Sequence, residues 1–243
     1  MSTTQGGGNI VADGLVLYLD AANTKSYPGS GTAWVDLSKV GNNGTLTNGP
    51  TFNSTNGGNI VFDGTNDYID CGNSNSLKFV NGDSFTISSW VKPISPMPIT
   101  ISAIAQHGGT PGSATGFILY LTNSGFVDFA KSNVANTGQN VTTTPFQFNL
   151  WNNIVCTILY SGSSGQIQFY INGVLKATYN GWSANPLLSD YVNSLYVGRS
   201  SVDSFFSFTP FYGNIANVSI YNKRLSDQEV LQNYNVTKSR FGL

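Results

Sequence analysis

The chain of 243 residues could hold two small domains, but all-β sandwiches of this size are often single units and no linker-like stretch divides the sequence, so we expect one domain. Charged residues make up only 9% of the chain, and Asn, Gly, Ser and Thr supply most of the polar groups. The net charge of −1 and the singly scattered basic residues argue against binding to nucleic acid, which requires clustered Lys and Arg.

The first residues, 1–12, form a Gly-rich polar segment without periodicity. We expect a flexible N-terminal arm there, followed by a single domain over 13–243. The segment lacks the basic region and the apolar core of a signal peptide, and the chain contains no apolar run as long as a transmembrane helix. The sequence therefore predicts neither Sec-dependent secretion nor a membrane span.

Alternating β-prone residues predict strands along most of the chain, beginning with 15–20. In 59–72, NIVFDGTNDYIDCG, two short β-prone runs flank an Asp-Gly turn, which predicts a hairpin. Residues 84–92 alternate between two faces, and Pro93 is expected to end that strand. Further strands are expected at 101–105, 117–121, 126–130, 151–160, 166–171, 174–178 and 212–221.

Three shorter patterns complete the expected structure. The Asn172-Gly173 pair between two alternating runs predicts a type I′ hairpin turn. One short helix of one or two turns is expected after Ser226, because Ser226 and Glu229 match a capping box. Cys71 and Cys156 lie in β-prone runs where a small apolar thiol packs readily, and a disulfide between them is the less favoured alternative.

Several of these segments resemble a laminin G-like domain, a member of the concanavalin A-like lectin/glucanase superfamily. The resemblance lies in FDGTNDYIDCG followed by FTISSWVKP, in WVDLSKVGNNGTLTNGPTF, and in WNNIVCTILYSGSSGQIQFYINGVLKATY. It covers residues 13 to about 234 and implies a concanavalin A-like jelly roll. Many short strands, few helices and frequent turn signals independently indicate an all-β jelly-roll β-sandwich of two antiparallel sheets with one short C-terminal helix.

The residues for common enzyme chemistry are largely missing. Glucanases need a pair of carboxylates, but the single glutamate, Glu229, is explained as a helix cap, and Asp67 and Asp70 would lie on opposite faces of a strand. The single histidine, His107, lies in QHGGTPGSATG, where we expect a solvated loop residue, and one histidine with two separated cysteines does not make a zinc site. We therefore expect no enzymatic activity.

Calcium is the one cofactor that this composition allows. Loops rich in Asp and Asn offer hard oxygen ligands, and the resemblance implies a calcium site at the rim of the sandwich. Asp63 and Asp67 are the preferred candidates, with Asp20 and Asp36 as further ones. The alternative is that these aspartates cap turns.

A group of aromatic residues lies in loop-like sequence rather than in strand alternation. On a rim they would stack on sugars or form a protein interface, and the alternative is that they close the ends of the sandwich. The group consists of Trp182, Tyr191, Phe205, Phe206, Phe208, Phe211 and Tyr212.

The resemblance implies a non-catalytic virion structural or adhesion protein of the type found in phages, acting as a capsid decoration or as a head or tail appendage. Its partners would be other virion proteins or copies of itself, together with cell-surface glycans, and it would be made in the host cytoplasm and face the exterior. The first alternative is a lectin-type carbohydrate-binding module of a larger cell-surface protein. A glucanase is the second alternative.

Overall fold

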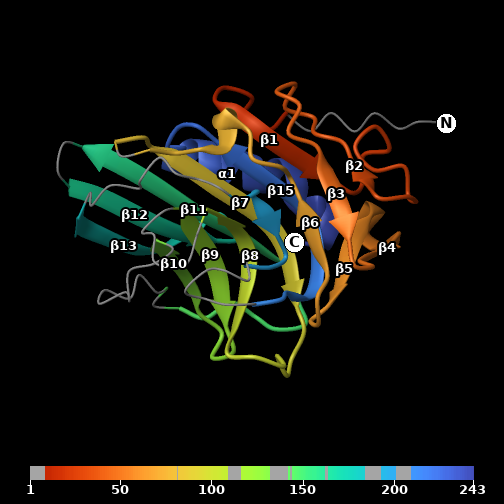
Figure 1. Cartoon of the computed structure of the whole chain (residues 1–243). Helices are drawn as coiled ribbons and strands as arrows, with labels where there is room; N and C mark the ends of the chain where they lie inside the picture. The colour runs from red at the N-terminus through yellow and green to blue at the C-terminus, as the bar shows by residue number, and fades with distance from the viewer. Residues whose placement is uncertain are drawn as a thin grey trace.

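The computed structural model describes residues 9–80, 82–108, 116–131, 142, 144–161, 164–183, 193–200 and 209–243. These residues form two antiparallel sheets stacked face to face, with one α-helix near the C-terminus (Figure 1). The expected all-β sandwich is thus confirmed.

The larger sheet has eight strands, in the order β13-β12-β11-β7-β15-β5-β4, with β1 paired to β15. Its strands are β1 (Leu15–Asp20), β4 (Thr51–Asn53), β5 (Asn59–Asp63), β7 (Phe85–Pro93), β11 (Asn152–Ser161), β12 (Ser164–Ile171), β13 (Val174–Ser183) and β15 (Tyr212–Tyr221).

The smaller sheet has seven strands, in the order β10-β9-β8-β14-β6-β3-β2. Its strands are β2 (Ala33–Trp34), β3 (Gly44–Thr47), β6 (Tyr68–Asp70), β8 (Ile101–His107), β9 (Phe117–Thr122), β10 (Val127–Lys131) and β14 (Tyr196–Val197). The helices are α1 (Asp227–Thr237) and three 3₁₀ turns, η1 (Thr55–Gly57), η2 (Asn75–Leu77) and η3 (Lys238–Phe241).

The main core lies between the two sheets. Phe85 from β7 stacks on Phe79 with the ring centroids 4.3 Å apart, and it meets Phe117 from the opposite sheet at 5.3 Å. All three side chains are buried. Burying an aromatic side chain of this size contributes about 1.5–3 kcal/mol, so such contacts hold the two sheets together.

The outer face of the eight-stranded sheet is covered by α1 and η3. Trp90 points away from the main core and stacks on Phe241 of η3, with the centroids 4.1 Å apart. The predicted capping box begins α1, because the backbone N–H of Glu229 donates to Ser226 Oγ and that of Ser226 donates to Glu229 Oε2. The helix is longer than predicted, since contacts with the sheet stabilise turns that the local sequence alone would not.

The predicted strands are present, with ends that shift by one or two residues for most of them. The Asn172-Gly173 turn is confirmed: the two residues have φ of 53° and 74°, and they join the antiparallel pair β12 and β13. Cys71 and Cys156 are buried and free.

The hairpin predicted for 59–72 is wrong. β5 pairs with β4 and β15 in the larger sheet, whereas β6 pairs with β3 and β14 in the smaller one, so the Asp-Gly turn is a corner that passes from one sheet to the other. Phe62 and Ile69 consequently enter the main core from opposite sides.

The prediction for His107 is also wrong. This residue is the last one of β8 and is fully buried. Its Nδ1 lies 2.9 Å from the carbonyl oxygen of Leu77, and its Nε2 lies 3.2 Å from Asn73 Oδ1. Burial lowers the pKa of His107 to about 4, so the imidazole is a neutral part of the structure at pH 7.

The last four residues of the expected N-terminal arm, 9–12, lie on the domain. The backbone N–H of Val11 donates to Asn233 Oδ1 at 2.8 Å, and Gln232 Nε2 donates to the carbonyl oxygen of Asn9 at 2.9 Å. Residues 1–8 lie outside the described part of the chain.

Candidate functional site

The outer face of the seven-stranded sheet carries polar and aromatic side chains that the main core does not use. Ile69 of β6 and Val197 of β14 belong to the main core. Because side chains alternate along a strand, their neighbours Tyr68 and Tyr196 point to the opposite, outer face. Both tyrosines are half-buried.

Tyr68 and Tyr196 form a cluster with Arg199. The two rings meet edge to face with their centroids 5.4 Å apart. The guanidinium carbon of Arg199 lies 3.6 Å from the centroid of Tyr68 and 4.5 Å from that of Tyr196. Both distances are within the range of a cation–π interaction. We call these three residues the Tyr–Arg cluster.

The backbone places Arg199 on this face through Gly198. The N–H of Gly198 donates to the carbonyl oxygen of Ile104 in β8 at 3.0 Å, and its own carbonyl accepts from the N–H of Phe211 at 2.7 Å. Gly198 has φ of +84°, and a Cβ at this position would lie 2.4 Å from the ring of Phe62. Only glycine fits both constraints, and it fixes the direction in which Arg199 leaves β14.

The strands beside the cluster add groups that can form hydrogen bonds. Tyr196 lies opposite Asp70 of β6 and Gln106 of β8 in the sheet register. Further along the same face, the hydroxyl of Tyr120 donates to Asp128 Oδ2 at 2.6 Å. Burial, and then the charge of Asp128, raises the pKa of the Tyr120 hydroxyl, so Tyr120 stays a donor. Gln106, Tyr120 and Asp128 are buried, so the groups here that can meet a ligand rich in hydroxyls are those of the Tyr–Arg cluster and the half-buried Asp70.

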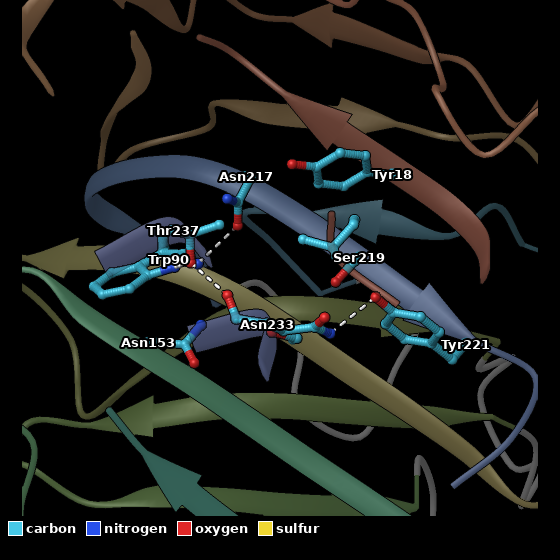
Figure 2. A pocket seen from close by; sticks show the side chains of 10 residues that line it. Tyr18, Trp90, Asn153, Asn217, Ser219, Tyr221, Asn233 and Thr237 are labelled. Carbon is cyan, nitrogen blue, oxygen red and sulfur yellow. Dashed lines mark hydrogen bonds between the residues drawn. The ribbon is translucent and has the colours of Figure 1, made fainter. Parts of the chain in front are cut away.

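The cavity under α1 is too small for such a ligand. Figure 2 shows it between the eight-stranded sheet and the helix, with Asn217, Ser219 and Asn233 among its polar lining. Its volume is about 20 Å³, close to the space that one water molecule needs. The side chain of Asn233 lines the cavity and donates from Nδ2 to the hydroxyl of Tyr221 at 3.0 Å.

A second hollow, of about 240 Å³, lies beside Trp151 and the C-terminal Leu243. The amide groups around it are largely committed to the fold. Asn56 Oδ1 accepts from the indole N–H of Trp151 at 3.0 Å, and Asn152 Nδ2 donates to two backbone carbonyl oxygens at 2.8 Å. The described amide groups of this hollow are therefore largely unavailable to a ligand.

The calcium candidates Asp63 and Asp67 lie together at the corner between β5 and β6. Asp67 Oδ2 accepts from the N–H of Asp63 at 3.0 Å, and Asp63 Oδ1 accepts from the N–H of Thr65 at 2.7 Å. Burial raises the pKa of the Asp67 carboxyl. Among the described residues, no three His, Cys, Asp or Glu side chains form a group that could hold a metal ion. The arrangement matches the turn-capping alternative, and calcium binding stays a prediction.

The two further calcium candidates also serve the fold. Asp36 accepts from the backbone N–H groups of Tyr18, Ser38, Gly41 and Asn42. Asp20 Oδ1 lies 2.7 Å from Arg240 Nη1 in an ion pair.

Most of the aromatic interface candidates lie outside the described residues, namely Tyr191, Phe205, Phe206 and Phe208. Trp182 belongs to strand β13 rather than to a loop, and Tyr212 begins β15. Phe211 is fully buried against Phe62, at a centroid distance of 5.8 Å. Sequence reasoning missed the Tyr–Arg cluster, although SLYVGRS carries an alternating pattern that could have been read as a short strand.

Comparison with solved structures reveals the same fold in several larger proteins. The binding domain of Paraclostridial Mosquitocidal Protein 1 matches 92% of this chain with a TM-score of 0.66 and 17% identity, and the match covers 52% of that chain. The Botulinum Neurotoxin serotype G binding domain matches 93% of this chain with a TM-score of 0.61 and 18% identity, covering 51% of that chain. A mutant of Trypanosoma rangeli sialidase displaying trans-sialidase activity matches 98%, with a TM-score of 0.65 and 16% identity.

This chain thus spans about half the length of the two toxin domains and 35% of the sialidase. No curated protein sequence matches it. The family model described as the concanavalin A-like lectin/glucanases superfamily matches residues 63–231, which include the Tyr–Arg cluster and both calcium candidates at the corner. The sandwich, its strand order and this match together establish that the chain belongs to the concanavalin A-like lectin/glucanase superfamily, in its laminin G-like branch.

Proposed function

We propose that this chain is a non-catalytic glycan-binding module. The observation that carries the proposal is the outer face of the seven-stranded sheet, where Tyr68 and Tyr196 are half-buried next to Arg199. Tyrosine rings stack on the apolar faces of sugar rings, and a neighbouring carboxylate, here that of Asp70, binds sugar hydroxyls. Two of the similar solved structures are described as binding domains, which supports the same kind of role here.

The positions of the carboxylates support a non-catalytic role. Hydrolysis of a glycosidic bond uses two carboxyl groups that face each other across the substrate. Glu229 is engaged at the start of α1, where it bonds Ser226 and forms an ion pair with Lys223 at 2.8 Å. Asp63 and Asp67 accept backbone N–H groups, and Asp128 accepts the hydroxyl of Tyr120. Each of these carboxylates therefore has a structural use.

Binding of the full chain to an array of immobilised glycans tests this proposal. We expect Tyr196→Ser to weaken binding of the selected glycan at least tenfold, and Trp151→Ala, at the second hollow, to leave it unchanged. Loss of binding in the Trp151 variant alone would place the site at the hollow instead. Absence of binding to any glycan, or hydrolysis of the bound one, would refute the proposal.

We further propose that the module is displayed on the exterior of a virion, as a decoration or an appendage bound to other virion proteins or to copies of itself. Support comes from the weakly charged surface composition and from the resemblance to phage laminin G-like domains. No helix in the described ranges is long and apolar enough to cross a membrane. Detection of the protein by mass spectrometry in purified virions tests this role.

The alternative location is a larger cell-surface protein in which this chain is one module. The observation that favours it is that each similar structure named above is substantially longer than this chain. Recovery of the protein from a cell-surface fraction, and its absence from purified virions, would support this alternative.

A further inference from the structure

Arg199 is a charged residue whose guanidinium has no ion-pair partner in the described part of the chain. The chain has three arginines. Arg240 forms an ion pair with Asp20 and donates to the backbone carbonyls of Asn56 and Gly58, and Arg224 donates to Gln168 Oε1.

The guanidinium of Arg199, by contrast, has no carboxylate within 4.0 Å among the described residues, and its Nε is buried without a hydrogen-bond partner. A buried donor left unpaired is unfavourable, so a group that binds the guanidinium would complete the arrangement.

The two tyrosines hold the guanidinium without using its hydrogen-bonding capacity. Their rings lie 3.6 Å and 4.5 Å from its central carbon, so they contact it through their π-systems. The N–H donors of a guanidinium lie in its plane, as a rigid fork that matches the two oxygens of a carboxylate. Stacking therefore fixes the orientation of Arg199 without using its hydrogen-bond donors.

The surrounding charges favour a ligand with a single carboxylate over a polyanion. Asp70 lies in the register position opposite Tyr196, and Asp128 lies further along the same face. The chain as a whole has a net charge of −1. A highly sulfated chain would meet repulsion from the half-buried Asp70, whereas one carboxylate can contact Arg199 while a neutral hydroxyl contacts Asp70.

We propose that Arg199, held between Tyr68 and Tyr196, binds the carboxylate of an acidic sugar residue in a glycan. This inference rests on the proposed function and names the class of glycan that the module recognises. A sialic acid and a uronic acid both supply such a carboxylate, and they are tested as separate ligands.

Isothermal titration calorimetry on the full chain tests the proposal with four probes: sialyllactose, a glucuronic acid-terminated oligosaccharide, lactose as the neutral counterpart, and a heparin oligosaccharide as the polyanion. We expect the wild type to prefer one of the two carboxylated sugars over lactose by at least tenfold. Arg199→Gln should abolish that preference, and Arg199→Lys, which keeps the charge but loses the fork, should reduce it. Arg224→Gln is the matched control, since it makes the same change away from the cluster and should leave the preference intact.

The outcomes separate this inference from the proposed function. Equal binding of lactose and both acidic sugars would overturn the carboxylate inference and leave glycan binding in place, whereas no binding to any sugar would remove both. Tighter binding of heparin that survives in Arg199→Lys would also overturn it, because simple charge attraction would then suffice. If Arg199→Gln does not fold, the test rests on the other two proteins. A wild-type preference for an acidic sugar that is reduced in Arg199→Lys supports the inference, and an unchanged preference in Arg199→Lys overturns it.

Discussion

Lowering the pH from 7.5 to 5 should destabilise this protein through His107, its single histidine. The imidazole is fully buried in β8, and burial lowers its pKa from 6.5 to about 4. Lys78 lowers this pKa further, while the hydrogen bond to the Leu77 carbonyl raises it.

The sign and size of the effect follow from these two pKa values. Well above pH 6.5 the imidazole is neutral in both the native and the unfolded chain, so the free energy of unfolding has its full value. As the pH falls from 6.5 towards 4, the unfolded chain binds a proton that the native state refuses, and stability is lost until both states are protonated. Between pH 7.5 and pH 5 the loss is about 2 kcal/mol, which is a large part of a typical folding free energy of about 5–15 kcal/mol.

Urea denaturation of the wild type and of His107→Gln at a series of pH values measures the loss. The free energy of unfolding should fall more steeply with decreasing pH in the wild type, and the difference between the curves should approach 2 kcal/mol at pH 5. The raised pKa of Asp67 affects both proteins equally and cancels in the difference. Parallel curves would refute the reasoning. Titration of the single imidazole by NMR is an independent check, because a native-state pKa near 6.5 would contradict the burial argument even if the variant does not fold.

Three further predictions address the turn, the metal and the arm. Gly173→Val should destabilise by about 1–3 kcal/mol, because φ is 74° and the new Cβ would lie 2.8 Å from the ring of Tyr234. Gly181→Val is the control for backbone strain alone, because Gly181 has φ of 73° and an added Cβ there would have nothing within 4 Å. If urea denaturation shows an equal loss of stability in both variants, the contact with Tyr234 contributes nothing. If the 63–67 corner binds calcium, a hundredfold excess over Kd should add about 2.7 kcal/mol, and a melting curve indifferent to chelator and calcium would exclude it. Deleting residues 1–8 should leave the melting temperature unchanged but weaken incorporation into virions, and normal incorporation would show that this segment is not a docking element.

The local sequence pattern correctly predicted those parts of the fold in which the interacting residues are close together in the sequence. The β12–β13 hairpin and the start of α1 depend on Asn172-Gly173 and on Ser226 with Glu229, and both signals act within a few residues. The 59–72 segment carries an equally good turn signal, yet it is a corner. Tertiary structure overrides the turn signal here. The backbone of each run forms its hydrogen bonds in a different sheet, and both runs bury apolar side chains in the same core.

His107 illustrates the limit of composition for single residues. Its neighbourhood is rich in Gly and polar residues, which favours a loop, but β8 extends to this residue because β9 pairs with it at Phe117. The backbone carbonyl of Leu77 then satisfies the ring. Neither partner is close in sequence, so no local pattern could have placed this side chain in the interior.

The Tyr–Arg cluster depends on register rather than on any motif. Tyr68 and Tyr196 belong to strands of three and two residues, far apart in the sequence, and β14 pairs with both β6 and β8. Once Ile69 and Val197 face the main core, alternation sends both tyrosines to the other face. A shift of one residue in either strand would bury a tyrosine in the core and expose an aliphatic side chain, at a cost that the main core would not tolerate. The packing that makes the sandwich stable therefore also fixes the geometry around Arg199.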